Sequence, residues 1–185
     1  MKSSLLAKRY AQALFDLAVE MKQLEDVAID MLLINSVLDE SRELRKVLDN
    51  PVLDDYKKVR IMDSLFGEKT QKLTLKFLHL IIKKGREGIL IQTCKAFDVI
   101  YKEYMNIMPV TLTTASEINE KTKKEILDKL AQITEKKLEV TEIIDPDIIA
   151  GFKLDFEDYQ YNNSVKVQLQ RLAKVFSDNL YVSKI

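Results

Sequence analysis

The sequence has few residues that interrupt regular structure. It contains four glycines and three prolines among 185 residues, and this scarcity favours long helices joined by short connections. A single cysteine, Cys94, excludes an intramolecular disulfide and a zinc site built from several cysteines. The longest apolar run extends from Phe77 to Ile82 with His79 inside it, which is far short of the roughly 20 residues needed to cross a bilayer. The sequence therefore predicts no membrane-spanning helix.

The chain also lacks an excess of charge of either sign. Lysine plus arginine and aspartate plus glutamate each number 29. A balanced chain has no overall field to attract nucleic acid or anionic lipid, so a charged partner must be met by a local patch. We therefore expect no nucleic-acid partner. With no signal peptide in view, the lone cysteine fits a reducing, cytosolic setting.

Residues arranged for catalysis or ligand binding are equally scarce. His79 is the only histidine, so no histidine pair can bind a metal or relay a proton. The only glycine cluster, Gly85 to Gly88, lacks the lysine-threonine ending of a phosphate loop and is better explained as a turn between helices. The acidic residues between Asp145 and Asp158 lack the spacing and glycine of a calcium loop. We expect no catalytic residue, no cofactor and no metal site.

The first half of the chain is expected to be helical. Apolar residues at helical spacing predict six helices, near residues 5–21, 24–38, 41–48, 54–65, 70–84 and 89–105. In the first helix a second apolar set, Ala7, Ala11 and Phe15, widens the main stripe. A helix that is apolar on more than one side either lies deep in a bundle or keeps one face for a partner.

The pattern changes after Pro109. Alternating β-branched residues predict a strand at 110–114, then a helix that begins at Ser116 or Asn119, and strands at 138–144 and 151–156. An amphipathic segment at 164–180 predicts a final helix. The expected fold is mainly α: a six-helix bundle over residues 1–106, followed by a small α+β domain over residues 110–185.

Four segments, taken together and in order, resemble one known family. They are residues 7–18 (AKRYAQALFDLA), Gly85-Arg86 after an apolar helix, the stretch from Leu138 through Ala150-Gly151 to Leu154, and residues 162–166 (NNSVK). The chain resembles the delta subunit of F-type ATP synthases, whose mitochondrial relative is the oligomycin-sensitivity-conferring protein. It departs from the family pattern at Asp155, Asn162 and Asn163.

The resemblance implies a mechanical role without catalysis. Such a subunit is a stator part that joins the catalytic head to the peripheral stalk, so that the head does not turn with the rotor. It implies two partners, the N-terminal helix of an alpha subunit and the b subunits of the stalk, with no direct small-molecule substrate. It also implies a peripheral position at the cytoplasmic face of the bacterial inner membrane, with membrane association only through the complex.

The family's site for the alpha helix is a groove between helices one and five. In this sequence six residues are expected to line it: Leu6, Tyr10, Ala13, Leu14, Phe77 and Leu80. The alternative is that these residues only fill the core of the bundle.

Three other functions stay open from the residues alone. A general helix-in-groove scaffold or chaperone would bind many amphipathic peptides. A small-molecule transferase centred on Asp145, Asp147 and Lys153 would need a deep polar pocket at that turn. A peripheral lipid binder would need a basic amphipathic face, for which the first helix offers Lys2, Lys8 and Arg9 at one end.

Overall fold

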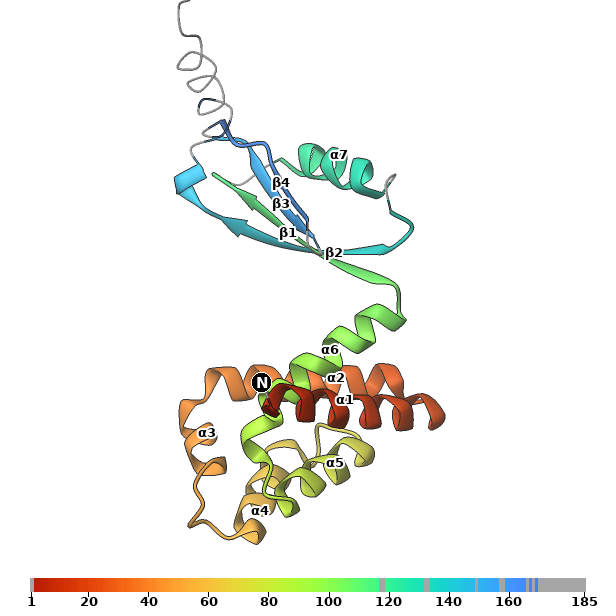
Figure 1. Ribbon diagram of the computed structural model, residues 1–185, viewed down its shortest axis with the longest axis vertical. Helices are drawn as coiled ribbons and strands as arrows, with labels where there is room; N and C mark the ends of the chain where they lie inside the picture. Colours follow the sequence, from red (N-terminus) through yellow and green to blue (C-terminus); the bar gives the residue numbers. More distant parts are fainter. Residues whose placement is uncertain are drawn as a thin grey trace, which may run out of the picture. The chain divides into compact units, whose positions relative to one another are not determined.

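The computed structural model describes residues 2–116, 119–131, 134–148, 150–156, 159–165, 167 and 169. The chain divides into two compact units, Met1–Met105 and Asn106–Ile185. Each unit has its own hydrophobic core. The expectation of a mainly helical first part followed by a part that mixes helix and strand is confirmed (Figure 1).

Seven helical segments make up the described part of the first unit, one more than the sequence predicted. They are α1 (Lys2–Glu20), α2 (Leu24–Glu40), α3 (Arg42–Leu48), α4 (Asp55–Phe66), α5 (Lys72–Lys83), the short 3-10 helix η1 (Glu87–Ile89) and α6 (Leu90–Tyr104). The additional segment is η1, which lies in the glycine cluster interpreted above as a turn. A three-residue helix carries no periodicity, so the sequence pattern could not reveal it.

Local chemistry explains where several helices begin and end. The Ser41 hydroxyl accepts a hydrogen bond from the Leu44 N–H at 3.2 Å and so caps α3. Gly85 has a φ of +59°, the left-handed conformation that ends α5. Gly67 is the C-cap residue of α4, with a right-handed φ of −54°, and its N–H donates a hydrogen bond to the Asp63 carbonyl.

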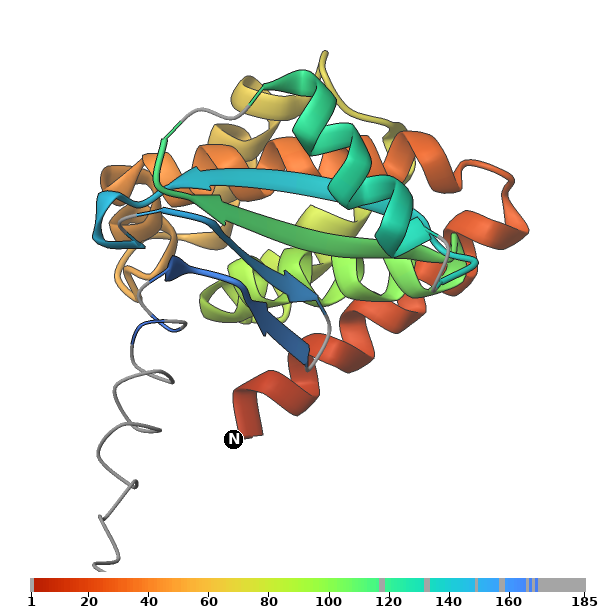
Figure 2. The same cartoon turned by 90° about the horizontal axis from the view of Figure 1, so that it is seen from above.

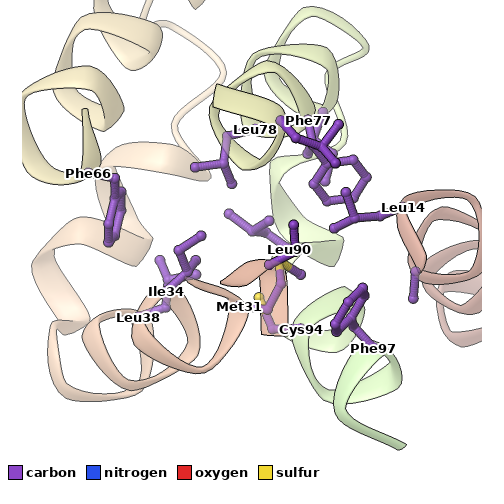
Figure 3. Close-up of a cluster of buried hydrophobic side chains, with 14 of the residues drawn as sticks. Leu14, Met31, Ile34, Leu38, Phe66, Phe77, Leu78, Leu90, Cys94 and Phe97 are labelled. Atoms are coloured by element: carbon purple, nitrogen blue, oxygen red, sulfur yellow. The ribbon is translucent and has the colours of Figure 1, made fainter. Parts of the chain in front are cut away.

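The first unit is held together by one apolar core. Its largest fully buried side chains come from four helices and include Met31, Ile34, Phe66, Leu78 and Phe97 (Figure 3). Helix α1 packs chiefly against α6. The side chains that α1 gives to the core are Ala7, Ala11, Leu14, Phe15 and Ala18. The second apolar set noted in the sequence therefore faces inward, together with Leu14 and Ala18.

The second unit contains a four-stranded sheet in the order β2-β1-β3-β4. Its elements are β1 (Ile107–Thr114), α7 (Glu120–Ala131), β2 (Lys137–Ile144), the 3-10 helix η2 (Pro146–Ile148), β3 (Phe152–Phe156) and β4 (Tyr159–Asn162). β1 is parallel to β2 and antiparallel to β3. The parallel pair is joined by α7, which lies across β1 and β2 on one face (Figure 2).

The core of the second unit lies between this face and α7. Val110 and Leu112 of β1, Leu154 of β3 and Leu130 of α7 are buried together. An ion pair between Lys123 of α7 and Glu142 of β2 connects the helix to the edge strand. Alternation along β1 thus supplies the buried face, as its β-branched pattern predicts.

β1 begins at Ile107, three residues earlier than predicted, and it includes Pro109. At Pro109 the strand pairs only with β2, since its pairing with β3 begins at Val110. A proline without an N–H is tolerated where one side of the strand has no partner. Only Met105 and Asn106 separate β1 from the end of α6.

Two further differences concern the end of the chain. The short strand β4 was not predicted, because four residues give too little alternation to recognise. The predicted helix over residues 164–180 lies mostly outside the described residues.

Candidate partner-binding groove

Helix α1 has a second apolar face that its own fold leaves uncovered. Beside the buried side chains it carries Leu17, 39% exposed, and Met21 after its last turn is 54% exposed. Tyr10 is half-buried and Ala13 is exposed. Because α1 packs against α6 chiefly through its buried residues, this neighbouring face is available to something other than the bundle.

Helix α5 supplies the facing wall. Leu73 and Phe77 are each 8% exposed and form its base, while Leu80 is 45% exposed at its lip. The start of α5 is fixed by a residue from another helix: Asp30 Oδ2 of α2 accepts hydrogen bonds from the Gln71 N–H at 2.8 Å and the Thr74 hydroxyl at 2.6 Å. The buried Asp30 carboxylate thus accepts an N–H that has no partner within α5, and it fixes the position of the N-terminus of this helix.

The two walls enclose an open groove with a volume of about 740 Å³. Leu14 points toward Phe77 (Figure 3), and the ring of Tyr10 meets the ring of Phe77 edge-on with centroids 6.5 Å apart. These contacts form the floor. All six residues predicted from the sequence line this groove: Leu6, Tyr10, Ala13, Leu14, Phe77 and Leu80.

Several lining residues were missed by the sequence analysis as site residues. Leu17, Met21 and Leu73 belong to stripes already visible in the sequence, so extending the predicted face by one turn would have found them. Arg9, Lys72, Lys76 and Gln23 complete the lining. Hydrophobic periodicity cannot identify these polar residues, because it reports only apolar positions.

The reactive side chains of the described residues are engaged elsewhere. His79 Nε2 lies 2.6 Å from Asp63 Oδ1 at the surface. Cys94 is 2% exposed in the core. Burial, with a smaller contribution from the Asp39 carboxylate, raises the pKa of the Cys94 thiol to about 12, so it stays protonated at neutral pH. Neither group faces the groove.

The described residues of the acidic segment in the second unit show no arrangement suited to a metal. In the described part of the chain, no group of three or more histidine, cysteine or acidic side chains could hold an ion. Lys153 Nζ lies 2.9 Å from Asp155 Oδ2 on the same strand. Partial burial raises the pKa of Asp155, but the hydrogen bonds from Lys153 and Gln160 and the charge of Lys153 outweigh it, and the net pKa is lowered. The side chain of Asp147 lies outside the described residues.

None of the helices, as far as the described residues extend, combines the length and apolar character needed to cross a bilayer. A helical bundle with an uncovered helix face and an apolar groove belongs to the class of folds that can accept an amphipathic helix.

Comparison with known proteins gives the particular family. Residues 6–176 match the family model described as ATP synthase delta (OSCP) subunit. The ATP synthase subunit delta of Christiangramia forsetii is 32% identical over 185 residues, which is the whole of both chains. That of Cytophaga hutchinsonii is 34% identical and covers 97% of this chain and 98% of its own. The chain belongs to the ATP synthase delta (OSCP) subunit family.

A solved structure supports the fold. A chain in the cryo-EM structure of the Toxoplasma gondii mitochondrial ATP synthase hexamer superimposes with a TM-score of 0.72. The match covers 95% of this chain and 99% of that one, at 24% sequence identity.

Proposed function

We propose that this protein is a non-catalytic stator subunit of an F-type, proton-transporting ATP synthase. It connects the catalytic head to the peripheral stalk, so that the head does not rotate with the rotor. Its place is peripheral, at the cytoplasmic face of the bacterial inner membrane, reached only through the complex. Membership of the delta (OSCP) family supports this function.

The first unit, as the domain 1–106, receives the N-terminal helix of an alpha subunit. The observation that carries this assignment is the open groove between α1 and α5, which is lined on both walls by apolar side chains. The alternative that these residues only fill the core does not account for Leu80, Leu17 and Met21, which remain 39% to 54% exposed. An amphipathic guest helix would cover them.

The second unit, as the domain 110–185, binds the b subunits of the peripheral stalk. Its separate core lets it serve a second partner without altering the groove of the first unit. Two attachment points on one chain are what a connector requires.

The other functions considered from the sequence are less well supported. A transferase site needs Lys153 directed at a substrate, whereas Lys153 is paired with Asp155. A lipid-binding face on α1 would have to include Lys8 and Arg9, and Arg9 is one of the residues that line the groove. A general scaffold differs from the proposal only in selectivity.

Calorimetric titration of the full chain with a synthetic peptide of the alpha subunit's N-terminal segment tests the proposal. A connector under torque should bind this peptide with a nanomolar Kd, which corresponds to a binding free energy of about 12 kcal/mol. Tyr10→Asp places a charge between Phe77 and the guest and should weaken binding at least about tenfold without unfolding the unit. Equal affinity for unrelated amphipathic peptides would favour the scaffold, and unchanged affinity in Tyr10→Asp would refute the groove.

A further inference from the structure

Among the described residues, the charged side chains that line the groove are all cations. Arg9 lies on the α1 wall, and Lys72 and Lys76 lie on the α5 wall. All three are exposed. In the described part of the chain, no aspartate or glutamate lines the groove, and the uncharged polar groups of its lining are the Gln23 amide and the Tyr10 hydroxyl. In a chain with 29 charges of each sign, this is a local patch of the kind that a charged partner requires.

These cations have no partner of their own among the described residues. The ion pairs of the first unit involve other lysines, such as Lys57 with Asp54 and Lys58 with Glu87. On α1, the nearby Asp16 accepts a hydrogen bond from Gln12 and does not line the groove. The positive rim is therefore not neutralised by a described carboxylate of this chain.

The spacing of the cations restricts what can lie between them. Lys72 and Lys76 are four residues apart on α5, so their side chains emerge on one face about 6 Å apart along the helix axis. Arg9 stands on the opposite wall and carries a planar guanidinium suited to a carboxylate. Two carboxylates one helical turn apart on a guest helix would match the lysine pair, and a third on its other edge would meet Arg9.

We infer that the groove selects an amphipathic helix whose apolar stripe is bordered by carboxylates, at least two of them one turn apart on the side facing α5. The inference rests on the proposed function and specifies the charge of its partner. The apolar floor supplies most of the affinity, while the exposed rim charges speed association and determine which helix is accepted. A basic-edged helix of equal hydrophobicity is repelled.

The inference can be checked first in the partner. The N-terminal segment of the alpha subunit from the same organism should carry aspartate or glutamate three or four residues apart beside its apolar stripe. A segment with a neutral or basic border would overturn the inference.

Binding kinetics with the full chain give the direct test. The probe is a synthetic peptide of that alpha segment, compared with a version in which the bordering acids are changed to glutamine or asparagine. The variant combines Arg9→Gln, Lys72→Gln and Lys76→Gln. The matched control combines Arg42→Gln, Lys46→Gln and Lys57→Gln, which removes the same charges from exposed positions on α3 and α4 outside the groove.

The groove variant should bind the native peptide about tenfold more weakly, mainly through slower association and with less dependence on salt. It should bind the neutralised peptide as the unaltered protein does. The control variant should keep the native affinity within about twofold.

Three results would overturn the inference. Equal binding of the native peptide by the groove variant and the unaltered protein would leave the groove in place and remove the role of its charges. Absence of binding by the unaltered protein would refute the proposed function as well. Displacement of the peptide by phosphatidylglycerol vesicles, lost in the groove variant, would assign the rim to a lipid surface.

Discussion

The carboxylate of Asp30 and the hydroxyl of Thr74 lie 2.6 Å apart, although 44 residues separate them in sequence. The same Oδ2 atom accepts the N–H of Gln71, so one buried side chain of α2 fixes the first turn of α5. Since α5 is one wall of the groove, the position of that wall depends on a residue that does not touch the guest.

Asp30→Ala should lower the free energy of unfolding by about 2 kcal/mol, because the Gln71 N–H and the Thr74 hydroxyl lose their acceptor. Urea denaturation measures this loss. Peptide affinity should also fall, since the start of α5 is no longer held. Asp26→Ala, an exposed aspartate one turn earlier on α2, is the control and should change stability by no more than about 0.5 kcal/mol.

Neighbouring lysines on α4 should differ sharply in their contribution to stability. Lys58 lies 2.7 Å from Glu87 with side chains 6% and 8% exposed, whereas Lys57 meets Asp54 with side chains 61% and 71% exposed. Lys58→Ala leaves the buried Glu87 carboxylate without a partner and should lower the free energy of unfolding by about 3 to 5 kcal/mol. Lys57→Ala should lower it by less than about 0.5 kcal/mol.

The double variant Lys58→Met/Glu87→Leu should recover most of the stability lost in Lys58→Ala, because neither charge is then left buried alone. If the single and double variants unfold at the same urea concentration, the pair is not the source of the effect. This ion pair connects α4 to the Gly85–Gly88 segment. Its loss should therefore also loosen the end of α5, which leads into that segment.

Two alanines on α1 separate core from groove. Ala11 is fully buried on the core-facing side of α1, whereas Ala13 is exposed and lines the groove. Ala13→Phe should leave the unfolding midpoint unchanged but reduce peptide affinity about tenfold or more, because the ring occupies space meant for the guest. Ala11→Phe should instead destabilise the unit by about 2 kcal/mol or more. Calorimetric titration measures the peptide affinity of both variants, and thermal unfolding measures their stability.

The buried thiol gives a prediction about pH. The pKa of Cys94 is raised to about 12 from its ordinary 9.0, so the folded protein should resist alkylation at pH 8 and react only on unfolding. A group with a raised folded-state pKa contributes fully below the unfolded pKa and loses that contribution as pH rises toward the folded value. The stability advantage over Cys94→Ala should therefore shrink by about 2 kcal/mol between pH 9 and pH 10.5. Urea titrations of both proteins at the two values measure it.

The sequence was sufficient for the elements that repeat a pattern over several turns. The first-unit α-helices lie close to the predicted ranges, and the six predicted groove residues line one cavity, because helical periodicity places Leu6, Tyr10 and Leu14 on one face. It could not identify η1 or β4, which are too short to show a period.

Features that depend on distant residues were also beyond the sequence. Nothing in the stripe of α2 marks Asp30 as the acceptor for α5, and nothing in the pattern of α4 marks Lys58 as the partner of Glu87. Both are charged residues, which a sequence pattern assigns to the solvent-exposed side of a helix. They are buried only because separate helices pack against each other. The charges around the groove were missed for a similar reason: Arg9, Lys72 and Lys76 come together only when α1 and α5 face each other.

The junction of α6 and β1 has a mechanical consequence. Two residues join α6 to β1, and the second of them, Asn106, adopts a left-handed φ of 56°. Three Cα-to-Cα steps span at most about 11 Å, so the tether has almost no slack to absorb. A force applied to one unit would therefore be transmitted to the other with little extension of the connection, whereas a long flexible linker would first have to be stretched.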